Sequence, residues 1–121
     1  MSPINKLTTP ELVKRFTEIA LEQDNAIRKF DSRKFNRLHV QMDAIREELK
    51  RRDGDQRAAL IPLYHHPNGQ VRLKAAITTL ALAPKAARAV ISAIANAEFS
   101  LQTADARDIL EGLDEGDYKP T

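Results

Sequence analysis

The sequence predicts an all-α protein of about six helices arranged in three antiparallel pairs. Apolar residues recur at the helical spacing in several segments, capping residues stand at the ends of these segments, and no segment alternates with period two. The length of 121 residues and a composition of 42% apolar and 30% charged residues fit one globular domain, 1–121. The absence of cysteine excludes disulfides, thiolate nucleophiles and cysteine-based zinc sites.

The first helix is predicted to follow a capping box formed by Thr8 and Glu11. The alternative start has Thr9 as the N-cap and Pro10 at the first helical position. The helical spacing continues for roughly 20 residues. The apolar face of this helix is expected to consist of Leu12, Phe16, Ile19, Ile27 and Phe30.

The second helix is predicted to begin at Asp31 or Ser32 and to end near Arg52, where Gly54 suits the C′ position. Its apolar residues form one seam along the helix: Phe35, Leu38, Met42, Ile45 and Leu49. The turn before it is short, and the seam is too short for a free coiled coil. Residues 7–53 are therefore expected to form an antiparallel helical hairpin.

The central segment, residues 55–96, is expected to hold three helices. Asp55 caps a short helix in which Pro62 should cause a kink. Asn68 caps the next helix, and Pro84 occupies the first position of the third.

Residues 97–121 are predicted to form an acidic C-terminal cap. Thr103 is expected to cap its helix, which runs to about Leu113. Residues 98–121 hold seven acidic and two basic residues, whereas residues 56–97 hold no acid at all.

The central segment resembles a HEAT repeat. The resemblance rests on Leu60-Ile61-Pro62-Leu63-Tyr64, His66-Pro67-Asn68, Val71-Arg72, Ala75-Ala76, Leu80 and Ala86-Ala87. In such a repeat Pro67 ends one helix and Asn68 begins the next, while Ala75 and Ala76 let paired helices approach closely. The resemblance implies a short α-α superhelix in which Arg72 ties neighbouring repeats together.

Nearly all of residues 7–121 also resembles a small bacterial family known as a domain of unknown function with a HEAT-like, armadillo-type fold. The matching segments are Phe16 to Asp24, Asn36-Arg37, Met42-Asp43, Gln56 to Ala76, Leu82-Ala83-Pro84, Leu113-Asp114-Glu115-Gly116 and Pro120. Genes of this family often lie near polymorphic toxin genes. The resemblance therefore implies a protein partner, a cognate toxin, and the role of an immunity protein that binds and neutralises it.

The residues indicate neither an enzyme nor a metal or cofactor site. Adjacent histidines such as His65 and His66 rarely bind one ion, and no serine has a base near it in the sequence. No apolar stretch is long enough to span a membrane, and Met1 to Pro10 lacks the apolar core of a signal peptide. We therefore expect a cytoplasmic protein with no membrane partner.

The expected partner-binding surface is the polar face that the second helices of stacked pairs share. Its predicted residues are Arg37, Gln41, Glu48, Gln70, Lys74, Asp105, Asp108 and Glu111. The three acids recur at three-residue steps, which places them along one side of a helix and suggests a cationic partner. The alternatives are a solvated polar face and an acidic cap that offsets the acid-free segment.

The alternative function is a HEAT-like nucleic-acid-binding protein whose cations contact phosphates. Those cations would be Arg33, Lys34, Arg37, Lys50, Arg51, Arg52 and Arg57. The acidic tail, the net charge of only +2 and the expected lack of exposed aromatic residues argue against nucleic acid as the partner.

Overall fold

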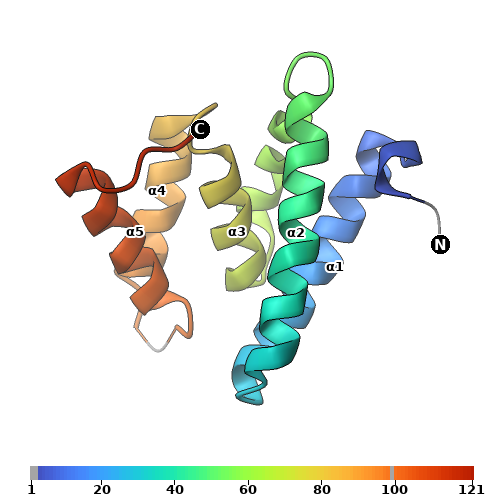
Figure 1. Cartoon of the computed structure of the whole chain (residues 1–121). Helices are drawn as coiled ribbons and strands as arrows, with labels where there is room; N and C mark the ends of the chain where they lie inside the picture. The colour runs from blue at the N-terminus through green and yellow to red at the C-terminus, as the bar shows by residue number, and fades with distance from the viewer. Residues whose placement is uncertain (1–2, 99) are drawn as a thin grey trace. The chain divides into compact units, whose positions relative to one another are not determined.

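The computed structural model of the chain describes residues 3–98 and 100–121 (Figure 1). In this part of the chain there is no strand, and helices stand at the six predicted positions. They are α1 (Thr9–Arg28), α2 (Ser32–Arg51), the 3-10 helix η2 (Gln56–His65), α3 (Gly69–Thr79), α4 (Pro84–Ala95) and α5 (Thr103–Glu115), preceded by the short 3-10 helix η1 (Ile4–Lys6). The chain divides into two compact units, Met1–Leu60 and Ile61–Thr121.

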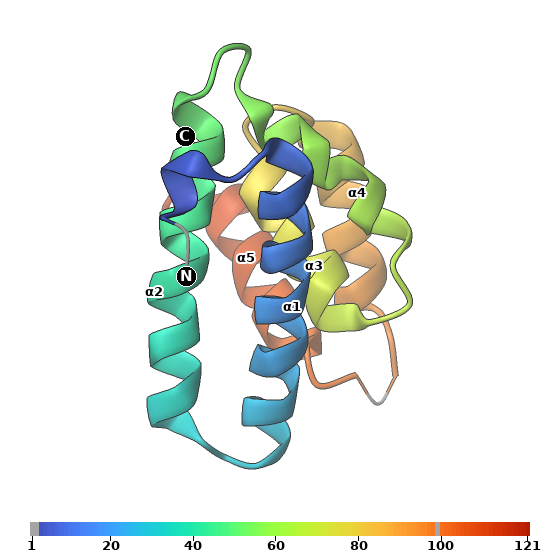
Figure 2. The ribbon, with the colours of Figure 1, turned by 90° about the vertical axis from the view of Figure 1, so that its right-hand side faces the viewer.

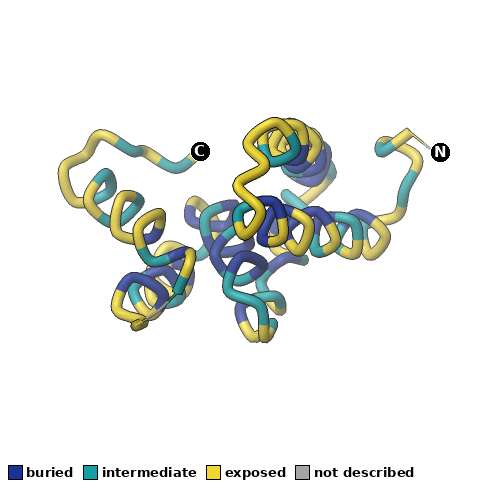
Figure 3. The backbone as a smooth tube through the Cα atoms, turned by 90° about the horizontal axis from the view of Figure 1, so that it is seen from below, coloured by how far each residue is buried: buried dark blue, intermediate teal, exposed yellow. Residues whose placement is uncertain are grey.

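In the first unit α1 and α2 lie side by side and run antiparallel (Figure 2), which confirms the predicted pairing of these two helices. The capping box is present: Thr8 Oγ1 accepts from the Glu11 amide at 3.2 Å, and Glu11 Oε1 accepts from the Thr8 amide at 2.9 Å. The bond from the Thr8 amide holds the pKa of Glu11 below its usual range. Each helix is buried on one side and exposed on the other, as Figure 3 shows.

The turn between α1 and α2 differs from the prediction at Phe30. The Phe30 amide donates to Ile27 O at 3.1 Å, and the Asp31 amide donates to Ala26 O at 2.9 Å, which is the Schellman pattern of a helix end. Phe30 has a φ of 54° and is 92% exposed, so its expected place on the apolar face was wrong. The reason is that Asp31 caps α2, which forces α1 to end before Phe30.

The short third helix is a 3-10 helix along its whole length rather than an α-helix with a kink. Pro62 lacks an amide hydrogen and cannot join an α-helical ladder, which favours this outcome. Asp55, with a φ of 51°, precedes it, and its carboxylate binds the guanidinium of Arg57 in bidentate fashion at 2.8 and 2.7 Å. Arg57 holds the pKa of Asp55 below its usual range. Gly54 adopts a φ of 78° in this turn, two residues after the C-cap of α2 at Arg52, and not at the predicted C′ position.

In the second unit α4 packs against both α3 and α5. Asn68 caps α3 as predicted, since its Oδ1 accepts from the amides of Gln70 and Val71 at 2.9 and 3.1 Å. Ala75 and Ala76 are fully buried in α3, which fits close approach of the helices.

The hydrogen bonds from Arg72 Nη1 do not match its predicted role between repeats. Its Nη1 donates to the carbonyls of His66 and Pro67 at 2.8 and 2.9 Å. Arg72 therefore fastens the turn that leads into its own helix. The chain follows the predicted break at Pro67, and His66 Nδ1 accepts from the Asn68 amide at 3.0 Å in the same turn.

Candidate functional site

The start of α5 is bonded to the end of α4, and the chain turns back at the end of α5. The Thr103 hydroxyl donates to the carbonyls of Ile94 and Ala97 at 3.0 and 3.2 Å, and so ties the start of α5 to the end of α4. Thr103 was predicted to be the N-cap, but the cap residue is Gln102, whose side chain makes no capping bond. At the other end Gly116 adopts a φ of 76° and lets the chain turn back over the helix.

Three of the predicted carboxylates line the outer side of α5. Asp105, Asp108 and Glu111 are all exposed, and no ion pair joins any of them to another residue in the described ranges. The nearby Arg107 does not neutralise them by direct pairing, because its Nε donates to Ala95 O at 3.0 Å. This bond satisfies a carbonyl that the end of α4 leaves free. The negative charge of the three carboxylates therefore stays available to a partner.

A hollow of about 440 Å³ lies where this acidic side meets the end of α4. Its lining combines apolar and acidic residues: Ala95, Asn96, Arg107, Leu110, Glu111, Asp114 and Glu115. Three carboxylates against one guanidinium leave the lining with a formal charge of −2, although Asp114 also pairs with Arg88 outside it. An apolar floor with an acidic rim suits a cationic side chain, whose alkyl stem packs while its head stays at the rim.

Of the residues that line this hollow, only Glu111 was predicted as a site residue. The missed signal is a spacing of four along α5, which sets Arg107, Glu111 and Glu115 in one row. The row does not predict that Ala95 also lines the hollow, because Ala95 belongs to the neighbouring helix, α4. We call this set of seven residues the acid-rimmed hollow.

A second hollow of about 390 Å³ is lined mostly by small apolar residues of α4, such as Ala89 and Ala93. Among the described residues its one charged lining residue is Arg72, whose Nη1 is already bonded to two backbone carbonyls. This hollow could accommodate an apolar group, but it has few polar groups that could orient a partner.

The remaining predicted site residues divide into exposed and buried ones. Arg37 and Gln41 are exposed on α2, and Lys74 is half-buried on α3. Glu48 and Gln70 were expected on the exposed face, but they are only 5% and 0% exposed, so that expectation was wrong. Glu48 instead accepts hydrogen bonds from Arg52 and Arg51 at the end of α2, and these bonds hold its pKa below the usual range.

Two of the cations proposed for phosphate contacts are used inside the chain. Arg57 is 2% exposed and bound to Asp55, and Arg52 is bound to Glu48 and to the backbone that precedes α1. Arg33, Arg37 and Arg51 remain exposed. The expectation that no aromatic residue is exposed was wrong, because the ring of Phe30 is open to water.

No group of three or more potential ligand residues in residues 3–98 and 100–121 is placed to hold a metal ion. His65 is exposed at the end of η2, and His66 is used in the turn before α3. None of the described helices combines the length and apolar character needed to cross a bilayer.

Comparison with known proteins gives a family and a solved structure. Residues 10–114 match the family described as Domain of unknown function (DUF2019). The crystal structure of the protein RPA1889 from Rhodopseudomonas palustris CGA009 is similar to this chain, with 44% identity, full coverage of both chains and a TM-score of 0.94. No match was found among curated proteins. The chain therefore belongs to the DUF2019 family.

Proposed function

We propose that the chain is a non-catalytic protein-binding module and that the acid-rimmed hollow receives a cationic segment of its partner. The observation that carries this proposal is the row of exposed carboxylates on α5, which form no ion pair within the described ranges and lie beside an apolar floor. The start of the helix is hydrogen-bonded to the end of α4, which limits the conformational freedom that α5 loses when a partner binds.

The carboxylates act mainly on the rate and specificity of association. Exposed charges add little to affinity when they pair singly, but a patch of one sign raises the encounter rate with an oppositely charged partner by roughly 10- to 1000-fold at low salt. The apolar floor around Ala95 and Leu110 is where the alkyl part of a lysine or arginine would be buried.

In finer terms, we propose that the partner is a bacterial toxin and that the chain is its immunity protein. This step rests on the family resemblance, which implies genes near polymorphic toxins. A toxin that acts on nucleic acid has a basic active-site cleft, and such a cleft presents the cations that the hollow would receive.

The experiment uses the protein encoded by the gene immediately upstream as the probe. The variant Asp105→Lys, Asp108→Lys, Glu111→Lys is expected to fold normally, because all three side chains are exposed, and to lose protection of cells that express the probe. The matched control Glu18→Lys, Glu22→Lys, Asp53→Lys changes the net charge equally at exposed acids of the first unit and should protect fully. If the α5 variant protects cells as fully as the control variant does, α5 is not the binding surface.

A further inference from the structure

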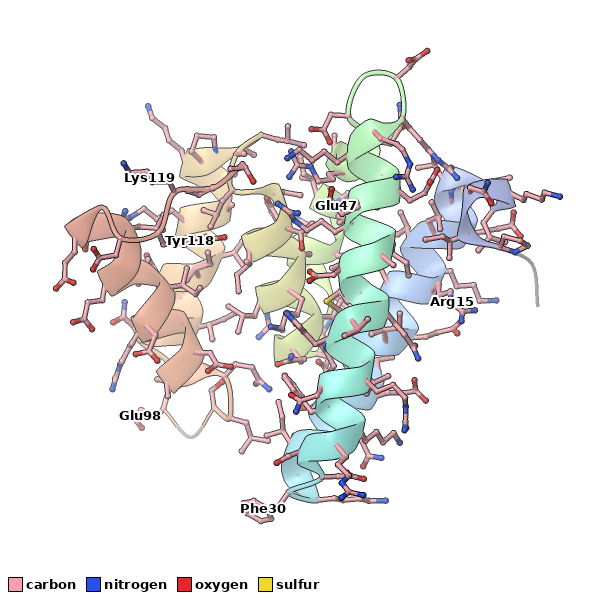
Figure 4. All side chains as sticks on the ribbon, viewed as in Figure 1. Arg15, Phe30, Glu47, Glu98, Tyr118 and Lys119 are labelled. Carbon is pink, nitrogen blue, oxygen red and sulfur yellow. The ribbon has the colours of Figure 1, made fainter. Side chains whose placement is uncertain are left out.

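The side chain of Phe30 gains almost no burial free energy on folding, and its backbone is strained. It is 92% exposed, and Figure 4 shows its ring pointing away from α1 and α2 at the tip of the hairpin. Its φ of 54° lies in the left-handed region, where a side chain is strained. Glycine is the usual residue at this position of a Schellman motif. Residues with strained backbones cluster at functional sites, which points to a role for the Phe30 ring in binding.

Basic residues are concentrated around Phe30 in the sequence. Residues 28–37 contain five basic residues and a single acid, Asp31. Asp31 is used as the cap of α2, because its Oδ1 accepts from the Lys34 amide at 3.1 Å. Three cations of this segment are exposed and form no ion pair with the described residues: Lys29, Arg33 and Arg37.

The second unit of the same chain carries a complementary surface. The acid-rimmed hollow has an apolar floor that includes Ala95 and Leu110, and exposed carboxylates of Glu111 and Glu115 at its edge. The hollow has a volume of about 440 Å³ and is open to solvent, so a ring that approaches from outside can reach its floor. The apolar floor of the hollow therefore complements the Phe30 ring, and the carboxylates at its edge complement the cations next to Phe30.

We propose that the Phe30 tip of one copy docks into the acid-rimmed hollow of a second copy. The ring would lie on the apolar floor, and Lys29 and Arg33 would face Glu111 and Glu115. This inference rests on the hollow used in the proposed function and gives that hollow a second occupant. Self-association covers the hollow until a cationic partner displaces the tip.

The contact area is that of one side chain and a few charged neighbours, which is far below a standard interface. We therefore expect a dissociation constant on the order of 10⁻⁴ M, with exchange between copies. Each copy has one tip and one hollow. Two copies can then dock reciprocally in a dimer, or copies can dock head-to-tail in larger assemblies. Either arrangement buries the same two surfaces, the tip and the hollow.

Other occupants of the tip fit less well. A single aromatic ring provides one stacking platform, whereas proteins that bind single strands use several. Stable attachment to a membrane requires a larger apolar anchor than one ring in addition to the cations. A second copy supplies both an apolar floor and a carboxylate rim.

Sedimentation velocity from micromolar to millimolar protein at low salt is the first test. The parent should gain mass with concentration and lose the gain at high salt. Phe30→Gly should stay monomeric throughout, with a melting temperature no lower than that of the parent. The control Val40→Ala removes another exposed apolar side chain, 68% exposed on α2, and should associate like the parent.

A charge swap tests the pairing of the two surfaces. Lys29→Glu, Arg33→Glu and, separately, Glu111→Lys, Glu115→Lys should each abolish self-association, because tip and hollow then carry the same sign. Mixing the two variants should restore association, since each tip then meets a hollow of opposite charge. A mixture that remains monomeric overturns the proposal.

Two further results would overturn the proposal. In the first, the parent stays monomeric at millimolar concentration. In the second, Phe30→Gly self-associates as the parent does. Binding of anionic vesicles or of an oligothymidylate that depends on Phe30, without self-association, would assign the tip to another partner. Phe30→Gly leaves the hollow intact, so the upstream gene product should still bind this variant. Loss of self-association alone therefore leaves the proposed function standing, and failure of the upstream product to bind leaves the self-association standing.

Discussion

Arg52 joins the end of α2 to the segment before α1, and its replacement tests the packing of the first unit. Its Nη2 donates to Leu7 O at 2.6 Å and to Ile4 O at 3.3 Å, and its Nη1 donates to Thr9 Oγ1 at 3.2 Å. Its Nε donates to Glu48 Oε2 at 2.8 Å. The side chain is only 20% exposed, so water replaces these bonds poorly when it is removed.

The expected cost follows from the bonds to neutral groups. A hydrogen bond from a charged donor contributes about 1.5–3 kcal/mol, and partial exposure favours the lower value. The bonds to Leu7 and Thr9 together then give about 3 kcal/mol for Arg52→Ala. For a chain of this length each kcal/mol lowers the melting temperature by about 4 °C, so a fall of about 12 °C is expected.

The matched control is Arg51→Ala. Arg51 binds the same carboxylate, Glu48, but its side chain is 64% exposed and forms no hydrogen bond with the described residues before α1. Its loss should cost less than about 1 kcal/mol. Thermal unfolding followed by circular dichroism, with urea titration as a second measure, gives both values. If the two variants melt at the same temperature, the bonds from Arg52 to the N-terminal segment do not stabilise the fold.

Two further predictions concern packing and pH. Ala76→Leu places a larger side chain at a fully buried position in α3 and should lower the free energy of unfolding by roughly 1–3 kcal/mol. The control Ala86→Leu changes an exposed position and should alter the free energy of unfolding little. Equal urea midpoints for the two variants would contradict this prediction. Three carboxylates have pKa values held below the usual range in the folded chain, so their stabilisation is complete above the ordinary carboxylate pKa of about 4 and is lost as the pH falls through the lower folded values. A urea midpoint that does not fall on acidification through that window would contradict the contribution of Glu11, Glu48 and Asp55.

Helix positions were predictable from the sequence because the signals are local. The Thr8 and Glu11 capping box, Asn68 before α3 and Pro84 at the start of α4 each depend on residues within one turn. The start of α5 was also predicted correctly. Thr103, however, stabilises this end by hydrogen bonds to α4 and is not the N-cap.

The errors arose where two local signals compete or where distant residues meet. The apolar spacing extends to Phe30, but the cap at Asp31 ends α1 first. A helical pattern places Glu48 among polar residues, yet it gives no sign that two arginines cover its carboxylate. The burial of Gln70 likewise depends on tertiary packing, which helical spacing alone does not determine.

The candidate site was predictable only in part. The three-residue spacing of Asp105, Asp108 and Glu111 correctly placed these acids on an exposed side of one helix. The apolar floor was not visible in the sequence, because Ala95 and Leu110 come from different helices.

The rate of association with the upstream gene product, measured across a salt series, tests the proposed function most directly. The parent should associate quickly at low salt and slow steeply as salt is added, because unpaired carboxylates on α5 attract a cationic partner. Reversal of Asp105, Asp108 and Glu111 to lysine should reduce the rate at low salt and flatten the salt dependence, while the control reversals in the first unit should not. An α5 variant with the parent's rate and salt dependence would contradict the account.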